Sequence, residues 1–214
     1  METLGTYLNT DNLILTQTEE VKSFIANCHK AYSAYLNKEA FSAFNIFVPQ
    51  YTSESEMTSL NNFVKNHKHL TGAVKKFLPI NNHTKFEDIV GDTSEDAKIT
   101  PIFMLPTEDF EYKNLRHKLW HIHLQNYSTI ILMPTRVTEW SRNINIFKQM
   151  SLKGVQFAVH VPELSLLTGF LDKKILKQMK SERLITFWLT TLMAINSPKQ
   201  GSSEKEVKLL VENI

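Results

Sequence analysis

The sequence predicts an α+β fold, in which a helical N-terminal third precedes a small antiparallel sheet packed with C-terminal helices. Apolar residues recur at helical spacing in the first eighty residues, whereas short apolar runs bounded by Pro, Gly and Asn recur after residue 99. A net acidic, turn-forming segment separates the two patterns. We therefore expect a helical region at 1–79, a linker or long loop at 80–98, an α+β domain at 99–196 and a polar tail at 197–214.

Composition narrows the class of protein. The chain has 214 residues, of which 42% are hydrophobic, and this is enough for a packed core. Cys28 is the only cysteine, so one chain forms neither an internal disulfide nor a cysteine-based zinc site. The start shows no leader pattern, and no run of apolar residues is long enough to cross a bilayer. These features predict a cytoplasmic protein without a membrane partner.

The predicted N-terminal elements are three helices. Thr16 to Glu19 forms a capping box, and the apolar stripe after it predicts a helix to about Asn37, with Cys28 as a small buried residue. Residues 41–48 fit a strand or the end of a helical hairpin. A second capping box at 53–56 introduces apolar stripes that predict helices through residue 78.

The C-terminal elements mix strands and helices. Ile102–Leu105 lies between two prolines and predicts a short or edge strand. The segments 114–124 and 128–133 follow as strands that are close enough to form a hairpin, and 155–161 is a further strand. Helices are expected at 140–147, ending toward Gly154, and at 164–179. The last apolar segment, 184–195, predicts a buried helix or, as an alternative, a central strand.

The segment 114–124 is chemically the densest in the chain, with three histidines inside seven residues. A strand would place His117, His121 and His123 on one face. Three imidazoles at this spacing could bind a transition metal, with His160 or Glu111 completing the ligand set. No carboxylate that would orient these histidines is evident, so we expect no metal and no cofactor.

A resemblance gives the segment a specific interpretation. His121-Ile122-His123-Leu124, preceded by Lys118, resembles the His-Ile-His-Leu segment of YafO-type toxins, which are ribosome-associated messenger-RNA interferases of the RelE-like group. The order of strands and helix from residue 99 to about 179 is also similar to that family. The spacing of Arg116 and His121 resembles, in addition, that of the HEPN ribonucleases. These resemblances imply a metal-independent endoribonuclease toxin that binds RNA or the ribosome, with an antitoxin or other protein as a further partner.

Each predicted site residue has a role in that interpretation. His121 and His123 divide the tasks of base and acid, and Arg116 or Lys118 supplies the cation for the developing phosphorane charge. The predicted substrate-binding residues are His117, Tyr127, Trp140, Arg142, Lys68, Lys75 and Lys76. Tyr127 or Trp140 would stack a base, and the lysines would meet phosphates without reading sequence.

A second class of function stays open. The chain lacks a Gly-rich phosphate loop and any His-Glu-x-x-His pattern, and it is rich in Asn, Ser, Thr and Lys. It could therefore be a non-enzymatic interaction or inhibitor protein encoded by a mobile element or phage, with the N-terminal third binding the partner.

Overall fold

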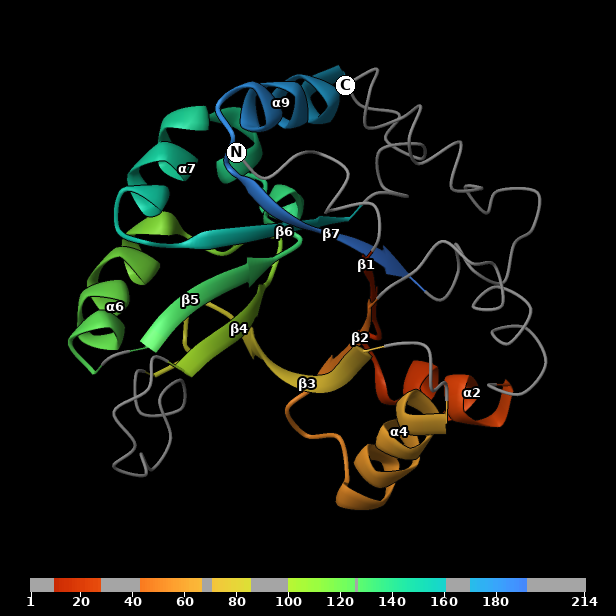
Figure 1. The fold of residues 1–214 in the computed structure, drawn as a ribbon. Helices are drawn as coiled ribbons and strands as arrows, with labels where there is room; N and C mark the ends of the chain where they lie inside the picture. The colour runs from red at the N-terminus through yellow and green to blue at the C-terminus, as the bar shows by residue number, and fades with distance from the viewer. Residues whose placement is uncertain are drawn as a thin grey trace. The chain divides into compact units, whose positions relative to one another are not determined.

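The structure is a computed structural model that describes residues 10–27, 43–66, 71–85, 100–125, 127–160 and 170–191 (Figure 1). In these ranges strands and helices alternate along most of the chain. The elements are β1 Thr10–Ile14, α2 Thr18–Asn27, β2 Ala43–Pro49, α4 Glu54–Asn66, β3 Thr71–Ile80, β4 Thr100–Pro106, α6 Tyr112–Leu124, β5 Tyr127–Leu132, η2 Pro134–Arg136, η3 Trp140–Arg142, α7 Ile144–Ser151, β6 Gln156–His160, α9 Phe170–Ser181 and β7 Ile185–Thr191.

Two compact units divide the chain. Unit 1 comprises Met1–Lys76, His160–Leu166 and Phe187–Asn213, and unit 2 comprises Phe77–Val159, Leu167–Thr186 and Ile214. In unit 1, β1 pairs with β2 and with β7. In unit 2, β4 lies between β3 and β5, and β5 lies between β4 and β6.

Each of these strand pairs is parallel, so the predicted small antiparallel sheet is wrong and the fold class is α/β. Parallel neighbours cannot be joined by a two-residue turn and need a crossover connection. The helices α2, α4, α6, α7 and α9 stand in such connections. The predicted hairpin is therefore also wrong, because α6 precedes β5 and β5 runs parallel to β4.

Three segments form a different element from the one predicted. The segment 114–124 lies in a helix, α6, rather than a strand, whereas 70–78 and 184–195 contain β3 and β7 where helices were preferred. Strand 102–105 is confirmed within β4, but β4 has neighbours on both sides and is not an edge. Its prolines are tolerated at the two ends of the strand, where a missing amide costs least.

Other elements agree with the prediction. Of the two alternatives left open for 41–48, the strand is correct, since β2 covers 43–49. Residues 128–133 contain most of β5, and 155–161 contain β6. Helices form at α2, α4, α7 and α9. Helix α2 is described only to Asn27, so Cys28 and the predicted continuation to Asn37 lie outside the described residues.

The core of unit 1 lies between the strands β1 and β2 and the helices α2 and α4. Phe24 of α2 and Phe63 of α4 meet edge to face, with ring centroids 5.4 Å apart. This geometry is favoured by the charge distribution of the rings and adds to the burial of their area. The buried residues of this cluster are Leu13, Leu15, Val21, Phe24, Ile46, Val48, Leu60, Phe63 and Val64.

A row of aromatic rings fills the core of unit 2. Phe110, which follows β4, packs edge to face on Trp140 of η3, and Trp140 packs on Phe147 of α7. Phe147 in turn contacts Phe157 of β6 at 5.4 Å between centroids. The row connects the segments after β4 and β5 with α7 and β6. It therefore fixes the loops at the carboxyl ends of these strands.

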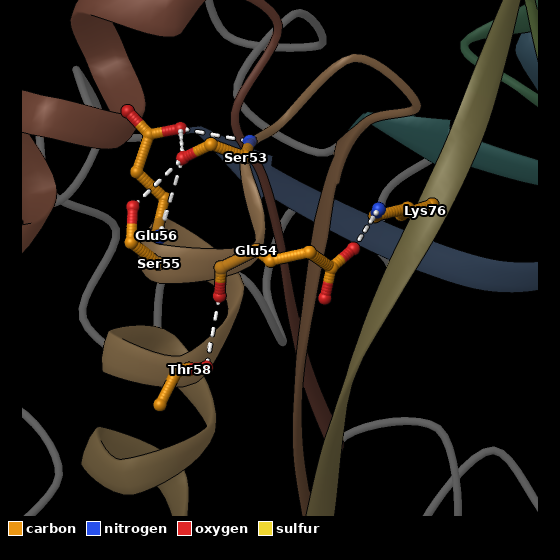
Figure 2. A network of polar contacts seen from close by, with 6 residues as sticks. All are labelled: Ser53, Glu54, Ser55, Glu56, Thr58 and Lys76. Atoms are coloured by element: carbon orange, nitrogen blue, oxygen red, sulfur yellow. Dashed lines mark hydrogen bonds and ion pairs between the residues drawn. The ribbon is translucent and has the colours of Figure 1, made fainter.

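The N-terminus of α4 forms the predicted capping box (Figure 2). The Ser53 backbone amide and hydroxyl donate to a Glu56 carboxylate oxygen at 3.0 and 2.7 Å, and the Glu56 amide donates back to the Ser53 hydroxyl. These bonds lower the pKa of Glu56, the Ser53 hydroxyl contributing most. At α2 the carboxylate that caps Thr16 belongs to Glu20 rather than to the predicted Glu19.

We predict that Ser53→Ala destabilises α4 by about 1 kcal/mol, because one capping acceptor is lost. The pKa of Glu56 should rise toward its ordinary value. Because the folded pKa is depressed, the stabilisation by Glu56 is present above pH 4.5 and is lost as the pH falls through the folded pKa. Carboxyl NMR titration and amide exchange in α4 measure both effects. Ser59→Ala is the matched control, since its hydroxyl only donates to the Ser55 carbonyl; an equal effect there would contradict the assignment.

Candidate functional site

The predicted catalytic residues all lie on α6, which packs on β5 through Leu115, Leu119 and Ile122. The helix places these residues on different faces rather than on one. Arg116, His117 and His121 are exposed, whereas Lys118 and His123 are half-buried. The Lys118 ammonium donates a hydrogen bond to the backbone carbonyl of Thr84. His121 also has an interaction partner.

His123 lies at the C-terminal end of α6, beside the turn before β6. A side chain at Gly154 would meet the His123 ring at 3.5 Å, and Gly154 has a φ of 78°, which favours glycine. Burial lowers the pKa of His123, and the nearby Lys153 ammonium lowers it further. The position of His123 near the start of β5 and β6 places it at the amino ends of these strands.

The predicted substrate-binding residues of unit 2 are dispersed. Tyr127 is half-buried at the start of β5, and Arg142 is exposed at the end of η3. Trp140 is fully buried between Phe110 and Phe147, so no face of its ring is available for stacking a base.

The described part of the predicted basic cluster, Lys75 and Lys76, lies on the strand β3 rather than on a helix. Lys75 lies over the Phe47 ring at 6.0 Å, and burial lowers its pKa. Lys76 forms an ion pair of 3.1 Å with Glu54 of α4 (Figure 2). Both lysines thus have partners within unit 1, and Lys68 lies outside the described residues.

A different set of polar residues lies at the carboxyl ends of β3, β4 and β5. Parallel α/β sheets usually bind ligands at this end of their strands. The register aligns Ile80 with Pro106, and the amide of Thr107 donates to the Ile80 carbonyl at 2.9 Å. The segments that leave this edge are 81–84, 107–109 and 133–136, and we call them the unit 2 edge.

Asn82 holds two of these segments together. Its side-chain amide donates to the carbonyl of Asp109 at 3.0 Å, and its carbonyl oxygen accepts from the Glu111 amide and from the Asn114 side chain at 2.9 Å each. The turn itself is closed by Asn81, whose side chain accepts from the His83 amide at 2.8 Å. The loop after β3 is therefore fixed against the start of α6.

The turn after β5 carries backbone strain. Met133 has φ 50° and ψ 48°, a left-handed conformation that costs free energy for any residue other than glycine. The cost is higher before a proline, and Pro134 follows. The Met133 amide donates to the Ala158 carbonyl at 2.8 Å, which holds the turn in place. Such strain is concentrated at functional sites in proteins. It directs the chain into η2 and positions Arg136 at the edge.

Arg136 is the cation of the unit 2 edge. Its guanidinium lies 3.7 Å from a carboxylate oxygen of Glu108, and the two side chains are 30% and 73% exposed. An ion pair this long and this exposed is weak and leaves the guanidinium available to another anion. At this edge the buried Thr107 Oγ1 has no hydrogen-bond partner among the described residues.

Within the described ranges, no group of three His, Cys, Asp or Glu side chains is arranged to hold a metal ion. The last residue of β6, His160, belongs to unit 1, and its side chain is outside the described residues. The three histidines of α6 do not form a metal site either, so the described residues supply no metal centre.

Sequence reasoning missed the unit 2 edge because its residues form no compact motif. Asn81 and Asn82 were interpreted only as part of a turn-forming segment, and neither residues 107–109 nor Arg136 were singled out. A signal was nevertheless present. Each polar group directly follows an apolar strand, and a parallel sheet brings such segments to one edge.

Comparison with known proteins concerns the fold. No family model and no curated protein matches the chain. A solved structure described as "Crystal structures of YwqE from Bacillus subtilis and CpsB from Streptococcus pneumoniae, unique metal-dependent tyrosine phosphatases" is similar, with a TM-score of 0.58 and 12% identity. The match covers 91% of this chain and 77% of that chain. At this identity the likeness establishes the α/β fold alone.

The comparison overturns the resemblance to YafO-type, RelE-like toxins, and with it the endoribonuclease activity that the resemblance implied. The four residues at 121–124 are part of a helix, so they cannot correspond to a strand segment. An RNA, ribosome or antitoxin partner stays a prediction.

We predict that Lys153→Gln raises the pKa of His123, because the repulsion between the ammonium and the imidazolium is removed. Burial should still hold that pKa below 6.5. NMR titration of the histidine ring protons measures the shift, with Lys65→Gln in unit 1 as the control. An unchanged His123 pKa in Lys153→Gln would show that burial alone accounts for the depression.

Proposed function

We propose that this chain is a phosphatase that acts on phosphotyrosine in proteins. It binds the phosphoryl group at the unit 2 edge. The observation that carries the proposal is the fold likeness to metal-dependent tyrosine phosphatases over 91% of the chain. The position of the polar residues supports it, because they lie at the carboxyl ends of parallel strands.

Arg136 is the proposed phosphate ligand. A guanidinium meets phosphate oxygens through two parallel hydrogen bonds, which gives direction as well as attraction. Its present partner, the carboxylate of Glu108 at 3.7 Å, is exposed and weak. A phosphoryl group carries up to two negative charges near neutral pH, so it competes well for the guanidinium against one exposed carboxylate.

The neighbouring segments would complete the binding surface. Asn82 fixes the loop after β3 to the segment after β4, so His83 is held on a turn rather than on a free loop. An exposed imidazole on such a turn is a hydrogen-bond donor to phosphate in its protonated form. Orientation of this kind lowers the entropic cost of binding.

A second candidate is binding of phosphotyrosine without hydrolysis. The observation that favours it is the lack, among the described residues, of a three-ligand metal group. The similar structure is described as metal-dependent, and the described residues do not fit that requirement. We assign no chemical step to a metal. In both candidates Arg136 is the residue that binds the phosphoryl group.

We predict that Arg136→Gln weakens binding of a phosphotyrosine peptide about tenfold or more, because a charge-assisted contact is lost. Calorimetry with the full chain measures the affinity, and the unphosphorylated peptide should not bind. Arg183→Gln is the matched control, since Arg183 lies in the turn before β7 and away from the edge. Equal affinity of Arg136→Gln and the unsubstituted chain would exclude Arg136 as the residue that binds the phosphoryl group.

Phosphate release from the same peptide, measured with and without added Mn²⁺, separates the two candidates. Release that depends on Arg136 supports a phosphatase. Binding without release supports the non-hydrolytic alternative. Absence of both would contradict the proposed function.

A further inference from the structure

We propose that the exposed face of α6, together with the turn before β6, is a contact surface for an anionic lipid bilayer. This surface consists of Lys113, Arg116, His117, Trp120, Leu124, Leu152 and Lys153, and we call it the α6 surface. It is independent of the proposed phosphate site.

The apolar part of the α6 surface is unusually exposed. Trp120 is 67% exposed and Leu124 is 64% exposed, and the spacing of four residues places them one above the other on the helix. Leu152 is 88% exposed in the turn after α7. The contact of His123 with Gly154 brings that turn beside the C-terminal end of α6. Three of the four large, exposed apolar side chains of the described residues therefore occur in one region.

This exposure is not a consequence of poor packing of the helix. The opposite face of α6 buries Leu115, Leu119 and Ile122 completely, each at 0% exposure. The helix is thus anchored to the sheet by a normal apolar stripe, and Trp120 and Leu124 are additional to it. Large apolar side chains that lie together outside the core mark a contact surface.

The charged part of the α6 surface has one sign. Arg116 is exposed between Lys113 and Trp120, and Lys153 is exposed in the turn beside His123. Neither α6 nor the turn 152–154 contains Asp or Glu. Lys113 is paired with Glu111 just before the helix, at 2.7 Å, and also lies near Glu139, so the net positive charge of the α6 surface rests on Arg116 and Lys153.

An anionic bilayer fits both parts. Lys and Arg near a negatively charged leaflet are attracted to its phosphates, while Trp and Leu enter the interface between headgroups and acyl chains. Protruding side chains on a helix and a turn suit a deformable lipid surface, which needs no preformed groove. The sequence-based expectation of no membrane partner rested on the lack of a membrane-crossing run, and no described helix is long and apolar enough to cross a bilayer. Peripheral contact needs no such segment, so the proposal replaces that expectation.

The test is co-sedimentation of the full chain with vesicles of phosphatidylcholine alone and with vesicles of phosphatidylcholine mixed with phosphatidylserine, an anionic lipid of cytoplasmic leaflets. We expect binding only to the anionic vesicles, and loss of binding as salt is raised. Tryptophan emission should shift to the blue on binding, and Trp120→Phe should remove most of that shift, because Trp140 is buried. Trp188→Phe, which changes the third tryptophan of the chain, should leave the shift in place.

Substitutions test which residues of the α6 surface contribute to vesicle binding. Arg116→Glu should lower the partition coefficient by about fivefold for each unit of charge changed. Trp120→Ala combined with Leu124→Ala should abolish binding at any salt concentration. The matched controls are Lys65→Glu and Tyr51→Ala, which alter an exposed lysine of α4 and an exposed aromatic residue after β2 in unit 1. Both should leave vesicle binding unchanged.

Two outcomes would overturn the proposal. Equal binding by the controls and by Trp120→Ala would assign the attraction to overall charge. A concentration-dependent dimer in sedimentation equilibrium that Trp120→Ala dissociates, without vesicle binding, would assign the α6 surface to a second copy of the chain. Arg136→Gln should retain vesicle binding, so failure of the phosphate site leaves this result intact.

Discussion

Parallel pairing is the constraint on which the rest of unit 2 depends. Each strand must be followed by a chain segment that returns to the other end of the sheet, so β4 requires α6 and β5 requires η2, η3 and α7. The strands between these connections are covered on their faces, and Thr129 to Leu132 of β5 is buried residue after residue. The polar groups that cannot enter such a sheet are displaced to its two ends. The unit 2 edge and the pair His123 and Lys153 are therefore at opposite ends for a topological reason.

Much of the secondary structure could be predicted from local chemistry. The capping box at Ser53 and the strands at 128–133 and 155–161 were found because their signals are confined to a few consecutive residues. Strand direction could not be found in the same way, because the partner of a strand is not adjacent in sequence. An unbroken apolar run such as 130–133 was nevertheless evidence for a strand covered on both faces, and thus for a parallel sheet.

The histidine-rich segment shows how two periodicities compete. Trp120, Ile122 and Leu124 alternate with histidines and fit a strand, whereas Leu115, Leu119 and Ile122 recur at the spacing of a helix. The sheet buries the second set, and Trp120 and Leu124 stay outside the core. Two of the three apolar residues that favoured the strand, Trp120 and Leu124, are therefore not part of the core. A surface with its own apolar residues thus obscures the helical pattern.

The indole of Trp140 has a consequence for the chemistry that the core can tolerate. Its N–H has no acceptor among the described residues, although the ring is completely enclosed by neighbours that include Phe110 and Phe147. The residue is therefore held by the shape and area of its ring, and its polar atom costs free energy rather than contributing it. A purely hydrocarbon ring of similar size would lose some packing but would also remove an unsatisfied donor. Position 140 thus selects for volume, and substitution there should be governed by fit rather than by hydrogen bonding.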